Sequence, residues 1–379
     1  MTRYQRCKKC IMDTSDTKIT FNELGICNHC LKFDEVSKLN WFPDSRGEIL
    51  LKKIIKNIKT TSRNNRYDCI LGLSGGLDST YLALKSYELG LNPLVMHVDA
   101  GWNSELAVKN IESLVKYCGF NLHTHVVYWN DIKNLHLAYL KAGVPNQDVP
   151  QDHIFTSSIY HFAVKNNIKY ILSGGNLASE GIFPQGWQGS NLDAKSLHSI
   201  YKKYGTKKLK EYKTLSIFDY YFWYPFIKGL RTIRPLNYME YNKEKALKEL
   251  QEKINYKEYP RKHGESIFTK FFQNYYLPKR FGIDKRLPHL SSLIVSEQIT
   301  RKEALEILKE DLYEKNELKK DKEYIAKKLG IDQIYLENLI NLPKKSFDDF
   351  PNNKDIVRII KFLQKRFKMI FKKTLKIYS

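Results

Sequence analysis

Residues 71–80 read Leu71-Gly72-Leu73-Ser74-Gly75-Gly76-Leu77-Asp78-Ser79-Thr80. This stretch follows an apolar run that begins at Cys69, and it opens a segment with helical spacing, residues 77–89. A strand, a glycine loop and a helix in this order direct backbone N–H groups and the positive end of a helix toward one point, where an anion binds. Glycines allow the close backbone approach that such a loop needs. The stretch predicts a phosphate-binding loop, and a glycine turn without a ligand is the alternative.

The side chains of this loop indicate the kind of phosphate chemistry. No lysine follows the glycines, so the loop is not a Walker loop. The pattern Ser-Gly-Gly-x-Asp-Ser instead resembles the PP-loop of the N-type ATP pyrophosphatases, which split ATP into AMP and pyrophosphate. The resemblance implies that ATP contacts Leu73, Ser74, Gly75, Gly76, Leu77, Asp78 and Ser79. Asp78 also offers a carboxylate for a Mg²⁺ ion that bridges phosphates, so Asp78 and Ser79 are candidate catalytic residues.

The composition bounds the class of protein. The chain has 379 residues, of which 42% are hydrophobic, enough for a substantial core and two to three domains. No apolar run has the length of a membrane span, and the first residues do not resemble a signal peptide, so we expect a cytoplasmic protein. The formal charge of +22 favours anionic partners. A general lysine bias on solvated helices explains this charge equally well.

Four cysteines near the start form two pairs, Cys7/Cys10 and Cys27/Cys30. Each pair has C-x2-C spacing, and this arrangement is typical of a tetrahedral zinc site with four thiolate ligands. Disulfides are the competing interpretation, but a reducing compartment disfavours them. Because protein atoms fill all four positions, we expect a structural role for the Zn²⁺ ion.

From about residue 66 the chain alternates short apolar runs with segments of helical spacing. This alternation predicts an α/β domain with a doubly wound parallel sheet, whose ligands lie at the carboxyl ends of the strands. The expected strands are residues 67–73, 92–99, 122–128 and 169–173, and the expected helices are residues 77–89, 105–117, 132–142 and 151–166.

The ends of the other strands hold further candidates. Val98 and Gly101 end the second strand, where PP-loop enzymes usually receive the adenine. Gly174 and Asn176 follow the fourth strand, and we expect all four of these residues to contact ATP. Glu180 lies shortly afterwards and is a second candidate ligand for Mg²⁺.

Residues 261–286 combine His, Glu, Ser, Thr and Gln side chains with aromatic residues and clustered cations. Cations there would suit the diphosphate of a substrate. Candidate substrate-binding residues are Lys262, Ser266, Gln273, Arg280, Lys285 and Arg286. A basic amphipathic helix that packs on the ATPase domain is the alternative.

Taken together, these segments resemble the N-acetyl sugar amidotransferases of bacterial lipopolysaccharide O-antigen and nonulosonic-acid biosynthesis. The resemblance extends from the cysteine pairs through the PP-loop and residues 98–105, 173–181 and 262–273 to about residue 340. Ala100 departs from it, because a polar Asn is expected there. The predicted domains are a zinc knuckle (1–45), a PP-loop ATP pyrophosphatase domain (46–235), a helical substrate or partner region (236–343) and a basic tail (344–379).

The resemblance implies that the acetamido group of a UDP-linked N-acetyl sugar becomes an acetamidino group. An amide oxygen is a poor leaving group, and transfer of AMP from ATP onto it gives an activated imidate that ammonia attacks. His263 or Glu265 would take a proton from ammonia. The enzyme contributes positioning and charge neutralisation.

The source of ammonia follows from the cysteines. A glutaminase needs an activated cysteine, and only Cys69 and Cys118 remain outside the two pairs. Cys69 lies in an expected strand and Cys118 at the end of an expected helix, so neither suits this role. The resemblance implies separate glutaminase and cyclase-like partners similar to those of histidine biosynthesis.

Two other functions remain as alternatives. A tRNA-thiolating PP-loop enzyme would carry sulfur on cysteines of its catalytic domain, and a zinc-bearing RNA-binding protein would not need Asp78 or Glu180. Under the main interpretation we expect no nucleic-acid partner. Residues 344–379 have basic and aromatic residues at helical spacing, which suits a peripheral membrane contact or a solvated helix.

Overall fold

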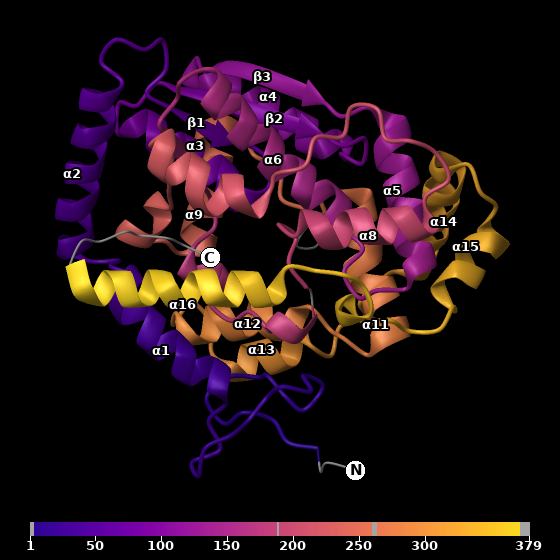
Figure 1. Ribbon diagram of the computed structural model, residues 1–379. Helices are drawn as coiled ribbons and strands as arrows, with labels where there is room; N and C mark the ends of the chain where they lie inside the picture. The colour runs from indigo at the N-terminus through magenta and orange to yellow at the C-terminus, as the bar shows by residue number, and fades with distance from the viewer. Residues whose placement is uncertain (1–3, 188, 260–263, 372–379) are drawn as a thin grey trace.

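A parallel sheet of five strands lies at the centre of the protein, in the order β3-β2-β1-β4-β5 (Figure 1). The computed structural model describes residues 4–187, 189–259 and 264–371. The strands are β1 (Cys69–Gly72), β2 (Pro93–Asp99), β3 (Asn121–Val126), β4 (Tyr170–Leu172) and β5 (Arg231–Ile233). The predicted fold class, a doubly wound parallel sheet with a four-cysteine cluster before it and a helical region after it, is confirmed.

Helices surround the sheet and build the C-terminal region. The α-helices are α1 (Asn28–Asn40), α2 (Ser45–Thr61), α3 (Leu77–Glu88), α4 (Glu105–Cys118), α5 (Trp129–Ala142), α6 (Val149–Lys165), α7 (Leu177–Glu180), α8 (Ala194–Tyr204), α9 (Lys243–Ile254), α10 (Ile267–Phe271), α11 (Leu277–Phe281), α12 (Arg286–Val295), α13 (Arg301–Ile307), α14 (Lys315–Leu329), α15 (Gln333–Ile340) and α16 (Lys354–Phe371). Two π-helical segments are η2 (Asp219–Ile227) and η4 (Phe272–Tyr276), and three 3-10 turns are η1 (Gln185–Trp187), η3 (Pro235–Tyr238) and η5 (Phe347–Asp349).

The inner strands are apolar along their whole length because a separate hydrophobic core covers each face of the sheet. Successive side chains of a strand point to opposite faces of the sheet. In β1, Cys69 and Leu71 join the core formed with α2, α3, α4 and α9, whereas Ile70 joins the core formed with α5, α6 and α8. Both faces are covered, so each position of the strand has to be apolar.

A third core forms away from the sheet. It joins the N-terminal cysteine region to helices α10–α15, and its largest buried side chains include Trp102 and Phe268. The C-terminal helices therefore pack on both the cysteine region and the loop that follows β2. The predicted domain boundaries stay a prediction.

Two strands differ from the expectations. The third strand is an edge strand with the sequence Asn-Leu-His-Thr-His-Val, and its side chains are exposed or half-buried. The fifth strand, Arg231–Ile233, was not predicted. It has three residues at the other edge of the sheet, which is too short for a period-two pattern to be recognised.

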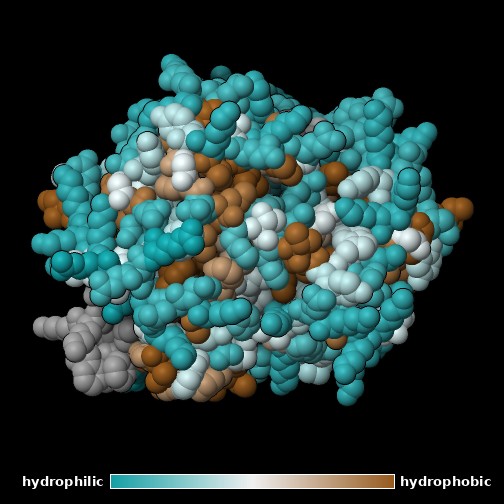
Figure 2. Space-filling view, turned by 90° about the horizontal axis from the view of Figure 1, so that it is seen from above, coloured by the Kyte–Doolittle hydropathy of each residue, from teal (hydrophilic) through white to brown (hydrophobic). Residues whose placement is uncertain are grey.

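The surface seen from above is mainly hydrophilic, with hydrophobic residues in separate patches (Figure 2). Within the described residues, no helix combines the length and the apolar character that crossing a bilayer requires.

Candidate active site

The loop between β1 and α3 is held in shape by its own hydroxyl groups. The Ser79 hydroxyl accepts a hydrogen bond from the Ser74 N–H (3.3 Å) and donates one to the Gly76 carbonyl (3.1 Å). The Ser74 hydroxyl accepts from the Gly76 N–H (3.2 Å). Gly75 has a φ of +82°, and a Cβ atom there would lie 2.8 Å from the Ala107 carbonyl oxygen. Only glycine therefore fits at position 75. The loop leads directly into the N-terminus of α3, where Gly76 is the N-cap residue.

Two tyrosines fix the same loop from the segment after α9. The hydroxyls of Tyr256 and Tyr259 both donate to the Gly75 carbonyl, at 3.2 and 3.0 Å. Burial raises the pKa of each phenol, so both remain proton donors. Neither tyrosine was predicted, because the loop motif contains no information about this distant segment.

The Asp78 carboxylate lies where the order of the strands reverses. The chain leaves β1 toward β2 and later returns to β4 on the other side of β1, and ligands of doubly wound sheets bind at this point. The Tyr241 hydroxyl donates to Asp78 Oδ1, and the Ser179 hydroxyl donates to Oδ2 at 3.2 Å. Burial, and then the negative charges of Asp78 and Glu180, raise the pKa of Tyr241. The charges of the two carboxylates that were predicted to bind Mg²⁺ thus both act on the Tyr241 phenol.

The fit of a magnesium ion rests on this donor set. Each carboxylate oxygen has two acceptor positions, so the hydrogen bonds from Tyr241 and Ser179, one on each oxygen of Asp78, are compatible with coordination of a cation. Mg²⁺ prefers oxygen ligands, and carboxylates commonly hold it together with phosphate oxygens. The Asp78 carboxylate therefore fits a magnesium ion, and Glu180 offers a second carboxylate in the same region.

The loop after β4 packs closely on the start of α3. A Cβ atom on Gly174 would lie 3.0 Å from the Ser79 backbone nitrogen, so a larger residue would push the two loops apart. Asn176 accepts from the Ser179 N–H at 2.8 Å and donates to the Gly174 carbonyl at 3.1 Å. The side chain of Asn176 thus caps α7, which places Glu180 in the site.

The loop after β2 is organised by His97. Its Nδ1 atom contacts the Leu73 carbonyl at 2.8 Å, and a carbonyl only accepts, so Nδ1 carries the proton. Nε2 then accepts from the Asn103 amide at 2.9 Å, and this amide also donates to Asp99 at 3.0 Å. Asp99 in turn accepts from the Gly101 N–H at 2.7 Å. This network links the PP-loop to the segment that was predicted to receive the adenine. Val98 is buried at its edge.

The C-terminal region joins this segment directly. The Ser104 N–H donates to the Glu265 carbonyl at 2.8 Å, and the Ile267 N–H donates to the Trp102 carbonyl at 2.9 Å. Between these two bonds lies an antiparallel bridge of Asn103 with Ser266. The ammonium group of Lys328 on α14 also donates to the carbonyl of Gly101, and lies 5.2 Å from the centre of the Trp102 ring.

Glu265 reaches the PP-loop through these contacts. A Cβ atom on Gly76 would lie 3.2 Å from Glu265 Oε1, so this carboxylate lies against the loop. The structure thus places one of the two predicted proton acceptors beside the residues that were predicted to bind phosphate. The other, His263, and the predicted substrate ligand Lys262 lie outside the described residues.

Ser266 is the first member of a buried hydrogen-bonded chain. The Thr269 hydroxyl donates to the Ser266 hydroxyl (3.0 Å), and the Gln151 amide donates to Thr269 (2.8 Å) and to Asp148 (2.6 Å). Burial, and then the charge of Asp152, raise the pKa of Asp148 well above its usual range. This hydrogen-bonded chain has no local sequence signal, because its two halves are more than one hundred residues apart.

Arg280, one of the residues predicted to bind the diphosphate of a substrate, is surrounded by backbone carbonyls. Arg280 is 5% exposed, and its guanidinium donates to the carbonyls of Leu339 (3.0 Å), Ile340, Gly143 (3.4 Å) and Pro343 (2.8 Å). These bonds commit the guanidinium to the fold, so the structure gives no support to a substrate contact by Arg280.

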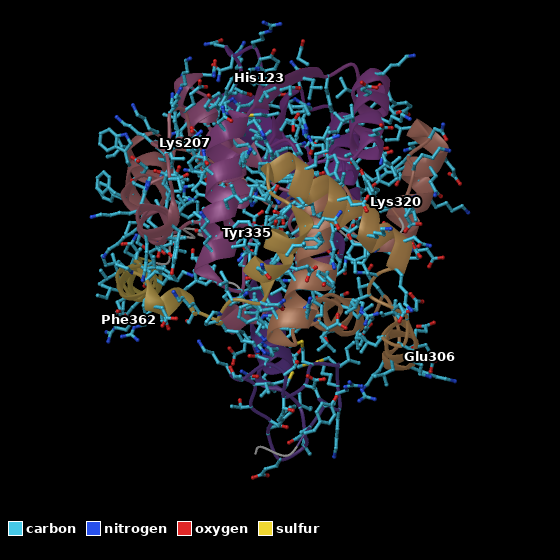
Figure 3. All side chains as sticks on the ribbon, turned by 90° about the vertical axis from the view of Figure 1, so that its right-hand side faces the viewer. His123, Lys207, Glu306, Lys320, Tyr335 and Phe362 are labelled. Carbon is cyan, nitrogen blue, oxygen red and sulfur yellow. The ribbon has the colours of Figure 1, made fainter. Side chains whose placement is uncertain are left out.

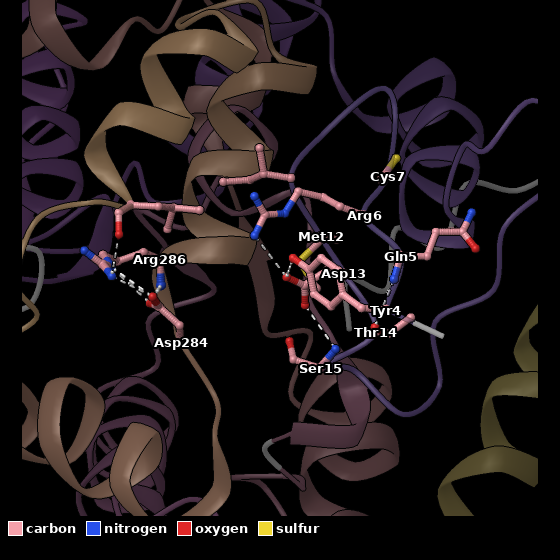
Figure 4. Close-up of polar contacts among 12 residues, drawn as sticks. Tyr4, Gln5, Arg6, Cys7, Met12, Asp13, Thr14, Ser15, Asp284 and Arg286 are labelled. Atoms are coloured by element: carbon pink, nitrogen blue, oxygen red, sulfur yellow. Dashed lines mark hydrogen bonds and ion pairs between the residues drawn. The ribbon is translucent and has the colours of Figure 1, made fainter. Parts of the chain in front are cut away.

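The side chain of Arg286 is likewise held by protein groups. Arg286 pairs with Asp284 at 2.8 Å and donates to carbonyls at the end of α13 (Figure 4). Lys285 is buried and lies 5.6 Å from the centre of the Phe183 ring, and its positive charge offsets only a small part of the increase in the pKa of Asp148. Gln273 is half-buried in the π-helical segment η4. Of the predicted substrate ligands that the structure describes, Ser266 therefore belongs to the hydrogen-bonded chain that ends at Asp148, and the charge of Lys285 acts on Asp148.

The four N-terminal cysteines form one buried cluster. Cys7, Cys10, Cys27 and Cys30 are fully buried, and their sulfur atoms all lie within 4.8 Å of one another. Neighbouring sulfurs are 3.7 to 3.9 Å apart. Four thiolates at about 2.3 Å from a tetrahedral zinc ion would be about 3.8 Å apart. The cluster thus has the dimensions of a metal site.

The cysteine region docks on the C-terminal helices. Arg301, the first residue of α13, donates to the carbonyls of Cys10 (3.0 Å) and Cys7 (3.2 Å). Beside the cluster, Arg6 and Tyr4 both contact Asp13, at 3.4 and 2.9 Å (Figure 4). The cluster lies in the third core and not at the PP-loop, which favours a structural role.

Fold and site together define a parallel α/β protein with a glycine-rich loop at the carboxyl ends of its strands. Residues 265–366 match the model of a family described as "LPS biosynthesis protein WbpG-like, C-terminal domain". The C-terminal part of the chain is thus similar to a domain of lipopolysaccharide biosynthesis proteins, and we call residues 265–366 the WbpG-like domain. No curated protein matches the sequence significantly.

Three solved structures resemble the chain at low identity. They are an NH3-dependent NAD synthetase from Campylobacter jejuni (18% identity, 41% of this chain and 72% of that chain, TM-score 0.28), an NMN synthetase from Francisella tularensis (16%, 56% and 94%, TM-score 0.29), and the U34-tRNA thiolase NcsA from Methanococcus maripaludis with its 4Fe-4S cluster (15%, 91% and 90%, TM-score 0.32). At these values the likenesses carry no argument about activity.

Proposed function

We propose that the protein is an ATP-dependent amidotransferase. It transfers AMP from ATP to the acetamido oxygen of a UDP-linked N-acetyl sugar, and ammonia then replaces that oxygen to give an acetamidino sugar for surface polysaccharide. One observation carries this proposal. Residues 265–267 of the WbpG-like domain pair with residues 102–104, and Glu265 lies against Gly76, so a domain similar to one of lipopolysaccharide biosynthesis proteins lies beside the loop that is proposed to bind phosphate.

In the first step the amide oxygen attacks the α-phosphorus of ATP, and the bond to pyrophosphate breaks. The N–H groups of the PP-loop and the hydroxyls of Ser74 and Ser79 hold the departing pyrophosphate. Asp78 and Glu180 would hold Mg²⁺, which would supply positive charge to neutralise the phosphates. Tyr241 and Ser179 keep the Asp78 carboxylate in position.

In the second step ammonia attacks the imidate carbon, one of its protons leaves, and AMP departs with the former amide oxygen. Glu265 lies against the PP-loop and is the proposed acceptor for that proton, with His263 as the alternative. Ser266 and Lys285 are the proposed contacts to the sugar nucleotide, because both belong to the polar region beside Asp148.

The two cysteines outside the cluster support the proposal that another protein produces the ammonia. Cys69 lies buried in β1 and Cys118 lies buried at the end of α4. Burial raises the pKa of both thiols, that of Cys118 to about 12, so neither is a thiolate at neutral pH. We therefore propose that a separate glutaminase, acting with a cyclase-like subunit, supplies the ammonia. The other four cysteines would hold a structural zinc ion.

The same observation disfavours the alternative, a tRNA-thiolating enzyme. Such an enzyme needs a reactive cysteine near the PP-loop to carry sulfur. The two cysteines outside the cluster are buried, protonated thiols of the core.

Measurement of the nucleotide products tests the proposal. With ATP, Mg²⁺, ammonium and a UDP-N-acetyl sugar, the protein should form AMP and pyrophosphate in equal amounts. Asp78→Asn should abolish both products. Asp34→Asn, which breaks an exposed ion pair with Lys9, is the matched control and should retain activity. Formation of ADP and phosphate, or normal turnover by Asp78→Asn, would contradict the proposal.

A further inference from the structure

The π-helical segment η2 presents its side chains in an unusual way. Its tyrosines face the protein: Tyr221 and Tyr224 are 7% exposed, and Tyr220 contacts Tyr160 of α6 with ring centres 5.3 Å apart. Its more apolar residues face outward. Exposed fractions are 57% for Phe218, 48% for Phe222, 38% for Trp223, 47% for Phe226 and 53% for Ile227. A helix that faced water alone would be expected to expose the hydroxyl-bearing rings and bury the others.

The exposed rings form one continuous patch. The ring centres of Phe218 and Phe222 are 5.3 Å apart, and those of Phe222 and Phe226 are 5.8 Å apart. The ammonium group of Lys228 lies 5.7 Å from the centre of the Trp223 ring. Aromatic rings with a cation beside them are typical of residues at a membrane interface.

Helix α16 has a second patch of the same kind. Ile356, Ile359, Phe362 and Leu363 are 47 to 58% exposed, and they recur at helical spacing. The helix also has six cations and one acid: Lys354, Arg358, Lys361, Lys365, Arg366 and Lys368 against Asp355. An exposed apolar stripe on a basic helix matches the pattern of helices that lie in a membrane interface.

Both patches lie on the same side of the protein. Segment η2 packs on α6, and the residues just before α16 contact the neighbouring helix α8, because Asn353 donates to Asp193, the N-cap residue of α8. Helices α6 and α8 cover the same face of the sheet. Figure 1 shows α16 across the front of the protein, and Figure 3 shows Phe362 at the outer edge, away from the sheet.

We propose that η2 and α16 form a docking face for an anionic lipid bilayer, which holds the protein at the membrane without crossing it. Charge complementarity identifies the occupant: an anionic bilayer offers both the apolar layer that the exposed rings need and the negative charge that the cations of α16 attract. An acidic protein surface would satisfy the cations but leave aromatic side chains of both elements uncovered. This inference does not depend on the reaction proposed above.

The test uses the full chain and vesicles. At low salt the protein should co-sediment with vesicles of phosphatidylglycerol and phosphatidylethanolamine, and binding to pure phosphatidylcholine vesicles should be at least about tenfold weaker. Phe222→Ser combined with Phe226→Ser, and separately Ile359→Ser combined with Phe362→Ser, should each reduce binding by about tenfold or more. Ile334→Ser on α15 removes a side chain that is 75% exposed outside this face and should leave binding unchanged.

A spectroscopic measurement separates insertion from simple charge attraction. Brominated lipid should quench the tryptophan fluorescence of the bound protein, and Trp223→Phe should remove most of that quenching, because Trp41, Trp102, Trp129 and Trp187 are buried or half-buried. All substitutions replace exposed side chains, so thermal unfolding should show a folded protein in each case. Absence of binding to anionic vesicles at low salt, equal binding to phosphatidylcholine, or variants that bind like the unmodified protein would overturn the proposal.

Discussion

Replacement of Tyr241 by phenylalanine tests whether the Tyr241 hydroxyl orients the Asp78 carboxylate for metal binding. The phenol is 4% exposed, and its hydroxyl donates to Asp78 Oδ1. The substitution removes that hydroxyl and keeps the ring, which packs against Tyr81 with ring centres 5.6 Å apart. Ser179 still donates to the other carboxylate oxygen. The expected consequence is a carboxylate that is less well oriented toward a cation.

The size of the effect follows from two independent estimates. A hydrogen bond to a charged group contributes about 1.5–3 kcal/mol. Removal of a residue that orients a metal ligand typically weakens metal binding by roughly 10- to 100-fold, which corresponds to about 1.4–2.7 kcal/mol. We therefore expect the Mg²⁺ concentration for half-maximal pyrophosphate release to rise by roughly 10- to 100-fold, while the rate at saturating Mg²⁺ falls much less.

The assay measures pyrophosphate release against Mg²⁺ concentration, together with thermal unfolding. Tyr276→Phe is the matched control, because this buried phenol donates to the Val144 carbonyl (3.0 Å) and accepts from the Gln147 amide (3.0 Å), away from Asp78. It should lower stability without changing the Mg²⁺ dependence. An unchanged Mg²⁺ dependence in Tyr241→Phe, or an equal shift in Tyr276→Phe, would refute the reasoning.

Three further changes have expected outcomes. Cys27→Ser should remove the metal, about one zinc per chain, and lower the melting temperature, as metal analysis and calorimetry can show; full metal content in the variant would contradict the four-thiolate site. Gly75→Val should weaken ATP binding strongly in a titration, since its Cβ would lie 2.8 Å from a carbonyl oxygen at a φ of +82°; wild-type affinity would argue against this loop as the phosphate site. Burial lowers the pKa of His136 to about 3, so the unfolded chain binds a proton that the folded chain excludes as the pH falls below about 6.5. Stability should therefore decrease toward acid pH, and His136→Gln should reduce that decrease in pH-dependent melting curves; an unaltered slope would contradict the assignment.

The sequence was sufficient to predict the sheet and the loop because both depend on local patterns. Alternating strand and helix segments around Gly75 and Gly76 indicate a parallel sheet, and the observed helix α3 begins at the predicted residue, Leu77. The close spacing within each cysteine pair likewise predicted a four-cysteine cluster, which the structure confirms. In each case, the residues that carry the signal are few and close together in the sequence.

The surroundings of the site could not be predicted, because they arise from contacts between distant segments. Tyr241 lies 163 residues from Asp78, and Tyr256 lies 181 residues from Gly75. A tyrosine that donates to a carboxylate has no local signature. Arg280 lies in a basic segment, and such a segment predicts a ligand for a diphosphate. Its four carbonyl partners become visible only in the folded chain.

Mass spectrometry of the sugar product tests the central claim most directly. The protein should be incubated with ATP, Mg²⁺, a panel of UDP-N-acetylhexosamines and either ammonium or glutamine. We predict a UDP-sugar in which NH replaces one oxygen, formed in equal amount with AMP, faster at higher pH where more NH₃ is present, and absent when glutamine is the only nitrogen source. A glutaminase and cyclase-like pair should restore the use of glutamine. Turnover with glutamine by the chain alone would contradict a separate source of ammonia, and sulfur transfer to tRNA without any modified sugar would contradict the proposed function.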